Sequence, residues 1–117
     1  MSRPADGAAI AALRLVAVHP DGGRADVAVS IDAPRAAEAE GEYTCQARLD
    51  GLFDGVPPMR GADSLQALCL AVRLVGELLA RFQAEGGTLL DEYGDELPLD
   101  AYFGAPGTTP PSRGADA

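Results

Sequence analysis

Residues 61–87 read GADSLQALCLAVRLVGELLARFQAEGG, and this stretch decides the fold because it is the one long helix that the sequence predicts. Asp63 suits the N-cap, since its carboxylate can accept hydrogen bonds from the free N–H groups of the first turn. Gln66 stands three residues later and can reach back across that turn, as in a capping box. The body is rich in Leu and Ala, which favour helix, and Gly86-Gly87 supplies the left-handed residue that ends many helices.

Placed at about 100° per residue, the side chains of the predicted helix form two apolar stripes. The first stripe is predicted to cover a sheet and comprises Leu65, Leu68, Cys69, Val72, Val75, Gly76 and Leu79. The second stripe lies on its flank, where Ala67 and Ala71 stand beside a leucine ridge made of Leu70, Leu74 and Leu78. A helix on a single sheet needs only one apolar stripe, so the leucine ridge predicts a further contact.

Alternation of apolar and polar residues predicts strands on both sides of this helix, at residues 8–18, 24–31, 42–49, 56–60 and 88–92. The turn at residues 20–23 (PDGG) joins the first two as a hairpin. The side of the sheet that faces the helix is predicted to comprise Leu13, Leu15, Val27, Val29, Ile31, Tyr43, Cys45, Ala47 and Leu49. The predicted fold class is α+β: an antiparallel meander of three to four strands, one long helix packed on one face, and a short final strand.

Composition sets the domain organisation and limits the partners. A single domain is predicted at residues 8–103, between a flexible arm at residues 1–7 and a disordered Gly- and Pro-rich tail at residues 104–117. The formal net charge of −9 argues against nucleic acid and anionic membranes, because phosphate binding needs clustered cations. The start of the chain lacks a signal-peptide pattern and no apolar run reaches membrane-spanning length, so a cytoplasmic location is expected.

Residues 10–92 resemble a family of small uncharacterised bacterial domains in the order and pattern of their elements. The resemblance rests on Cys45, on Gly51-Leu52 and on the segment GADSLQALCLA at residues 61–71. Members of that family end a run of strands with a helix that starts G-x-D-S-L-Q-A-L. The resemblance implies a fold, and it implies no activity, cofactor or site residue.

The segment GADSL at residues 61–65 also resembles the G-x-D-S-L motif of acyl and peptidyl carrier proteins. In that family the serine hydroxyl receives 4′-phosphopantetheine and the following helix docks on partner enzymes, which implies Ser64 as the attachment site. The chain departs from that family in two respects. Carrier domains are helix bundles, whereas the residues before Gly61 alternate like strands, and Arg73 and Arg81 stand where acidic residues are expected.

Carboxylates gather near the end of the predicted domain, at Asp91, Glu92, Asp95, Glu96 and Asp100. Their oxygens suit Ca²⁺ or Mg²⁺, but their spacing does not match an EF-hand loop. We interpret Asp91, Glu92, Asp95 and Glu96 as an acidic edge that docks a basic partner. The other reactive residues are interpreted structurally: His19 as a turn residue, and Cys45 and Cys69 as small buried residues.

These observations favour a non-enzymatic protein-binding module, such as an adaptor, an accessory subunit or an immunity-like inhibitor. It would bind its partner through the leucine ridge and the acidic edge, and no cofactor or metal is expected. Two covers for the ridge stay open: residues 97–103 folding back, or another molecule, with a homodimer as the simplest case. The alternative function is a carrier protein modified on Ser64. An enzyme ranks behind both, because catalysis needs converging His, carboxylate or Cys groups.

We expect the chain to stay unmodified when it is incubated with coenzyme A and a broad-specificity phosphopantetheinyl transferase. The reason is that Ser64 is predicted to be a first-turn helix residue beside the Asp63 cap. Intact-protein mass spectrometry measures the outcome, with an authentic carrier protein as the positive control. A mass gain that maps to Ser64 would establish a carrier protein and contradict the mixed fold.

Overall fold

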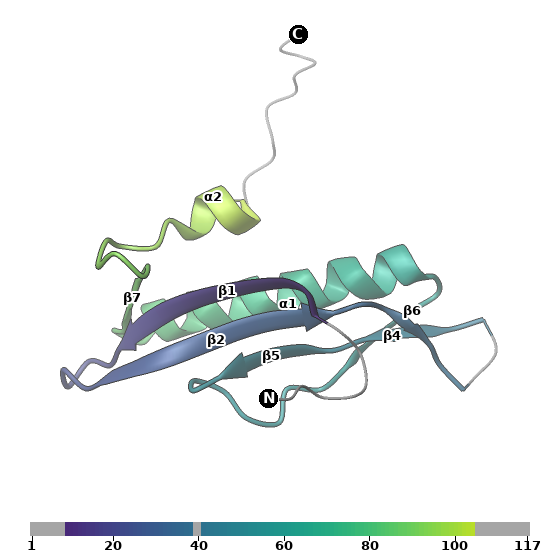
Figure 1. Cartoon of the computed structure of the whole chain (residues 1–117), viewed down its shortest axis with the longest axis horizontal. Coiled ribbons are helices and arrows are strands. Elements are labelled where there is room, and N and C mark those ends of the chain that lie inside the picture. The colour runs from purple at the N-terminus through teal and green to yellow at the C-terminus, as the bar shows by residue number, and fades with distance from the viewer. Residues whose placement is uncertain (1–8, 39–40, 105–117) are drawn as a thin grey trace, which may run out of the picture.

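The computed structural model describes residues 9–38 and 41–104, so the predicted arm and residues 105–117 of the predicted tail lie outside the described residues. The strands are β1 (Ala9–Val18), β2 (Arg24–Asp32), β3 (Arg35–Ala36), β4 (Tyr43–Cys45), β5 (Ala47–Asp50), β6 (Met59–Gly61) and β7 (Thr88–Leu90). The helices are α1 (Ser64–Ala84) and α2 (Leu99–Phe103) (Figure 1). The fold class is α+β, as predicted, and it differs from the helix bundle of carrier proteins.

The strands form two antiparallel sheets, with the order β5-β2-β1-β7 in the larger and β3-β4-β6 in the smaller. β1 and β2 make the predicted hairpin, and its turn is closed by the His19 N–H, which donates to the Gly23 carbonyl oxygen at 2.7 Å. β7 lies beside β1 and pairs with it at Val16, Ala17 and Val18. Figure 1 shows α1 running behind β1 and β2, from β6 towards β7.

The strand predicted at residues 42–49 is divided at Gln46, with β4 in the smaller sheet and β5 in the larger. The Gln46 carbonyl oxygen accepts from the Asp32 N–H at 2.9 Å. Its side-chain amide donates to the carbonyl oxygens of Ala47 and Val56, at 2.8 Å each. These bonds hold the bend between the sheets, which alternation alone does not reveal. The short strand β3 also lies outside the five predicted strands.

The core lies between the sheets and α1. All the strand residues predicted to face the helix contribute to it, since Leu13 and Tyr43 pack against the buried cluster and the others are buried within it. Leu89 of β7 and Leu97, which follows β7, complete this cluster. The prediction for the inner face of the sheet is therefore confirmed.

α1 buries a stripe that shares only Val75 and Leu79 with the predicted one, and it includes Ala67 and Ala71, which were predicted on the flank. Its buried residues are Ala67, Ala71, Val75, Leu79 and Phe82. In the predicted stripe, Leu65 is 67% exposed and Cys69 is also exposed, so the prediction that they are buried is wrong. The cause is a close approach near the start of the helix. A Cβ atom at Gly61 would lie 2.5 Å from the backbone nitrogen of Ala67. The backbones of β6 and α1 are therefore so close at this point that a leucine side chain has no room between them.

The ends of α1 follow the predicted chemistry. Asp63 is the N-cap, and its Oδ1 accepts from the Gln66 N–H at 2.8 Å. Gln66 Oε1 accepts in turn from the Ala62 N–H at 2.6 Å. Gly86 has a φ of +101°, the left-handed region that glycine adopts without strain, and it stands just past the last turn.

We expect Asp63→Ala to lower the free energy of unfolding by about 1 kcal/mol, because first-turn N–H groups lose their acceptor. Urea denaturation followed by circular dichroism measures the change. Ser64→Ala is the matched control, since it alters the neighbouring side chain and leaves the cap in place. An equal loss of stability in the two variants would contradict the role of Asp63.

Candidate functional site

A groove lies between α1 and α2, with a volume of about 840 Å³. Apolar side chains dominate its lining, which comprises Leu68, Cys69, Val72, Arg73, Gly76, Glu77, Ala80, Gln83, Leu99, Asp100, Phe103 and Gly104. A concave, mostly apolar surface of this size with a few polar groups is typical of binding sites. We refer to it as the α1–α2 groove.

The second wall of the groove exists because the chain folds back after β7. Leu97 is buried in the core, and its N–H donates to the Leu89 carbonyl oxygen at 2.8 Å. α2 then places Phe103 against Gly76: a Cβ atom at Gly76 would lie 2.9 Å from Phe103 Cγ. Glycine inside a helix costs about 1 kcal/mol relative to alanine. At Gly76 the glycine allows α2 to approach α1 closely, because it has no side chain between the helices.

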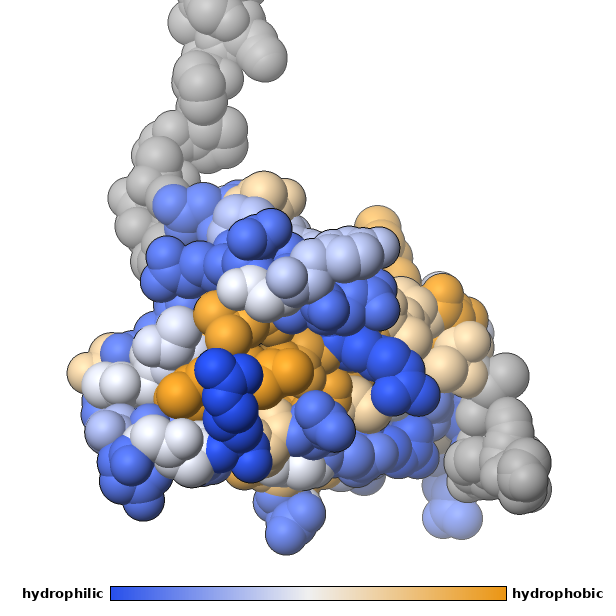
Figure 2. Space-filling view, turned by 60° about the vertical axis from the view of Figure 1, so that its left-hand side comes forward, coloured by the Kyte–Doolittle hydropathy of each residue, from blue (hydrophilic) through white to orange (hydrophobic). Residues whose placement is uncertain are grey.

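Charged side chains stand at the rim of the α1–α2 groove. Arg73 Nε lies 3.3 Å from Glu77 Oε2, and both side chains are exposed. Asp100 of α2 is exposed as well. Figure 2, in which the left-hand side of Figure 1 comes forward, shows hydrophobic residues gathered in the middle of that face and framed by hydrophilic ones. An apolar centre with a charged rim is the usual anatomy of a protein-binding surface.

The leucine ridge lies on the other side of α1 from the groove. Leu78 packs against the buried core, whereas Leu70 and Leu74 are half-buried outside that packed set. Residues 97–103 do fold back on α1, as one of the two open alternatives has it. These residues pack on the side of α1 that carries Gly76, which is opposite the leucine ridge. The cover of the ridge therefore stays open.

The groove residues of α1 are functional candidates that the sequence pattern did not identify. The stripe predicted to face the sheet includes Leu68, Val72 and Gly76. Because the prediction buries these three residues, it excludes them from any exposed binding surface, yet they line the groove. The one sequence signal for this flank is the internal glycine, because a costly glycine in a strong helix indicates close packing.

The acidic edge forms the turn between β7 and α2. Asp91 Oδ1 accepts from the Tyr93 and Asp95 N–H groups at 2.8 Å and 2.9 Å, so this carboxylate holds the turn. Glu92, Asp95 and Glu96 are exposed. Within residues 9–38 and 41–104, no three His, Cys, Asp or Glu side chains form a group that could hold a metal ion.

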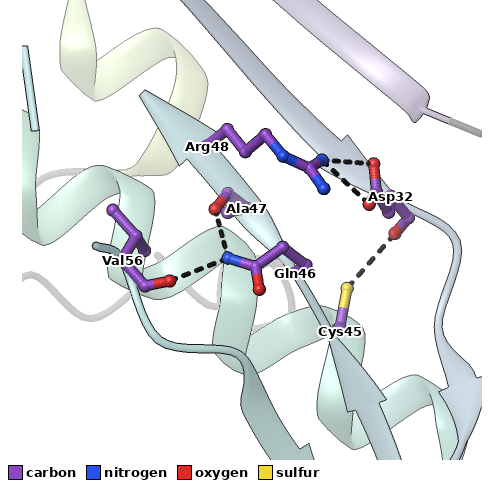
Figure 3. Close-up of polar contacts among 6 residues, drawn as sticks. All are labelled: Asp32, Cys45, Gln46, Ala47, Arg48 and Val56. Carbon is purple, nitrogen blue, oxygen red and sulfur yellow. Dashed lines mark hydrogen bonds and ion pairs between the residues drawn. The ribbon is translucent and has the colours of Figure 1, made fainter. Parts of the chain in front are cut away.

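A second polar cluster lies where the two sheets meet (Figure 3). Asp32 is only 5% exposed, and Arg48 Nη1 donates to both of its carboxylate oxygens at 2.9 Å. The Cys45 thiol donates to the Asp32 main-chain oxygen at 3.3 Å. Burial, and then the charge of Asp32, raise the pKa of the Cys45 thiol. A buried thiol that stays protonated is a weak nucleophile, and the bonds of this cluster join β2 to β4 and β5.

The remaining candidates from the sequence, apart from Cys69, lie away from the groove. His19 is exposed in the hairpin turn, and its ring stands edge-on to Phe82 with the ring centroids 5.3 Å apart. Ser64 is the first residue of α1 and is exposed beside the Asp63 cap. Cys45 is buried as predicted, whereas Cys69 lines the groove.

We expect Gly76→Ala to detach α2 from α1, because the new methyl group would overlap the Phe103 ring. The same change favours the helical state of α1 by about 1 kcal/mol, so the core should not lose stability. Chymotrypsin should cut several-fold faster after Tyr102 or Phe103, and mass spectrometry locates the cut. Arg81→Ala, an exposed change on the same helix outside the groove, is the control. A cleavage rate equal to that of the parent would contradict the contact.

Comparison with known proteins places the chain in a family. No helix among the described residues is long and apolar enough to cross a membrane. No curated protein and no solved structure matches the chain. The family described as a domain of unknown function (DUF6968) matches residues 12–99, from within β1 to the first residue of α2. The chain therefore belongs to this family of domains of unknown function.

Proposed function

We propose that this chain is a non-enzymatic, cytoplasmic protein-binding module that takes an apolar, positively charged segment of another protein in the α1–α2 groove. The observation that carries the proposal is the groove itself, whose apolar side chains are left partly exposed between two helices. The acidic edge, which leads directly into α2, would attract the partner. The leucine ridge is a second candidate contact on the opposite side of α1.

The apolar part of the groove is large enough to support such binding. Leu68, Val72, Leu99 and Phe103 are half-buried, so each keeps surface that a partner can cover. Complete burial of a large aliphatic or aromatic side chain contributes about 1.5–3 kcal/mol. A few such contacts leave enough free energy for micromolar association after the costs of ordering both surfaces.

The charge of the chain favours a basic partner. The formal net charge is −9, and Glu92, Asp95 and Glu96 are exposed in the turn that precedes α2. Opposite charges raise the rate of association and contribute to specificity, and both effects weaken as salt screens them. The carboxylates would therefore attract a partner whose apolar residues then enter the groove.

The proposal is tested by cross-linking from Cys69, which lines the groove, while Cys45 is buried and protected from labelling. A maleimide that carries a photoreactive group on Cys69 captures the partner, and titration with the purified partner gives the affinity. We expect Val72→Asp to weaken binding at least tenfold, about 1.4 kcal/mol, and added salt to weaken it as well.

Leu74→Glu is the matched control, because it places a charge on the leucine ridge and leaves the groove unchanged. Loss of binding in Leu74→Glu but not in Val72→Asp would move the contact surface to the ridge. Binding that survives both substitutions would contradict a role for α1, and with it the proposed function.

A further inference from the structure

The apolar side of α1 that lines the groove continues beyond the part that α2 reaches. At about 100° per residue, this side of the helix carries Leu65, Leu68, Cys69, Val72 and Gly76. α2 meets it at Gly76, where Phe103 packs, and Figure 1 shows α1 extending past α2 towards β6. α2 therefore leaves the turns before Gly76 uncovered. We refer to Leu65, Leu68, Cys69 and Val72 as the open stripe.

The open stripe presents apolar side chains to solvent in a continuous row. Leu65 is 67% exposed, Cys69 is exposed, and Leu68 and Val72 are half-buried. From Leu65 to the Phe103 contact at Gly76 the row is about 16 Å long, or roughly three helical turns. Single exposed apolar residues are common on protein surfaces, whereas a contiguous row next to an apolar groove indicates a contact surface.

The wall that α1 presents selects the conformation of a bound segment. Residues 68–83 lie within α1, so their N–H and C=O groups bond to one another along the helix and leave only side chains for a partner. An extended segment on this wall would bury main-chain N–H and C=O groups without partners, which costs free energy. An α-helix satisfies its own main-chain groups and turns one apolar face to the wall. The wall therefore favours a helix.

α2 shows that this side of α1 accepts a helix. Phe103 of α2 lies on Gly76, and Leu99, four residues earlier, also lines the groove. Two apolar side chains at positions i and i+4 thus face α1, which is the spacing by which an amphipathic helix enters an apolar groove. A partner helix in line with α2 would repeat this contact on the open stripe.

The composition of the chain argues against two other occupants of the open stripe. Residues 105–117 contain three prolines and no apolar residue larger than Ala, so they lack the large side chains that would fill the stripe. A second copy of the chain carries the same formal net charge of −9, so the two copies repel each other. A basic segment of another protein meets neither obstacle.

We propose that the bound segment is a basic, amphipathic α-helix of about three turns, which lies along the open stripe in line with α2. This inference rests on the proposed function and adds the conformation and the position of the partner segment. Apolar side chains spaced three and four residues apart pack on Leu65, Leu68 and Val72. Arg and Lys side chains occupy its other positions, because the chain that binds it is acidic.

Display of random peptides of about 16 residues, enough for roughly four helical turns, tests the conformation. Peptides are selected on the parent chain, and those that also bind Val72→Asp are discarded, which keeps the groove binders. We expect the selected peptides to carry apolar residues three and four apart, with Arg or Lys between them, and to gain helical circular dichroism on binding. Proline at a central polar position should weaken binding at least tenfold, whereas alanine at the same position should not.

Leu65→Glu tests the position of the bound helix. Leu65 is 67% exposed, so the substitution spares the core, and fluorescence polarisation should show at least tenfold weaker binding of the selected peptides. Ala84→Glu is the matched control, because it adds the same charge at an exposed residue of α1 that does not line the groove. Equal affinity for the parent chain and Leu65→Glu would overturn the proposed position.

The outcomes separate this inference from the function on which it rests. Selected peptides that need Val72, alternate apolar and polar residues and tolerate proline would overturn the helix and leave the proposed function standing. If no selected peptide needs Val72, the proposed function fails and the inference fails with it. A parent chain that is dimeric by light scattering, and that Val72→Asp makes monomeric, would place a second copy on the stripe and overturn the inference.

Discussion

The close approach of α1 to the sheets at its first turns is the constraint on which the rest of the structure depends. Gly61, the last residue of β6, lies against the backbone of Ala67, where a Cβ atom on Gly61 would force the two apart. Ala67 and Ala71 are completely buried there, and Val75, Leu79 and Phe82 fill the space further along the helix. This stripe fixes the rotation of α1 about its own axis.

The rotation of α1 in turn decides which of its flanks are left for function. It turns Gly76 and Val72 to the side where the chain returns after β7, so that Phe103 can sit on the glycine and complete the groove. It turns Leu70 and Leu74 to the opposite side. The α1–α2 groove is thus a consequence of core packing at the other end of the helix, because a helix is a rigid element that transmits its orientation along its length.

The residues matched by the family model include the core and α1 but only the first residue of α2. It takes in residues 12–99, which include Gly61, the buried stripe of α1 and the acidic edge. It ends at Leu99, so most of α2, including Phe103, lies beyond it. The core and the α1 wall of the groove therefore lie within the matched residues, whereas most of α2 lies outside them.

The sequence by itself determined the features that depend on near neighbours in the chain. These are the Asp63 cap, the end of α1 near Gly86, the β1–β2 hairpin and the inward side of each strand, because capping, turn chemistry and alternation act over a few residues. Only the tertiary structure decided the face of α1 that is buried, the bend at Gln46 and the position of α2. By hydrophobicity alone, leucine is expected to be buried in preference to alanine. Where the backbone of a glycine lies opposite, however, only the smaller side chain fits. The sequence does not reveal this neighbour, because Gly61 and Ala67 meet only in the folded chain.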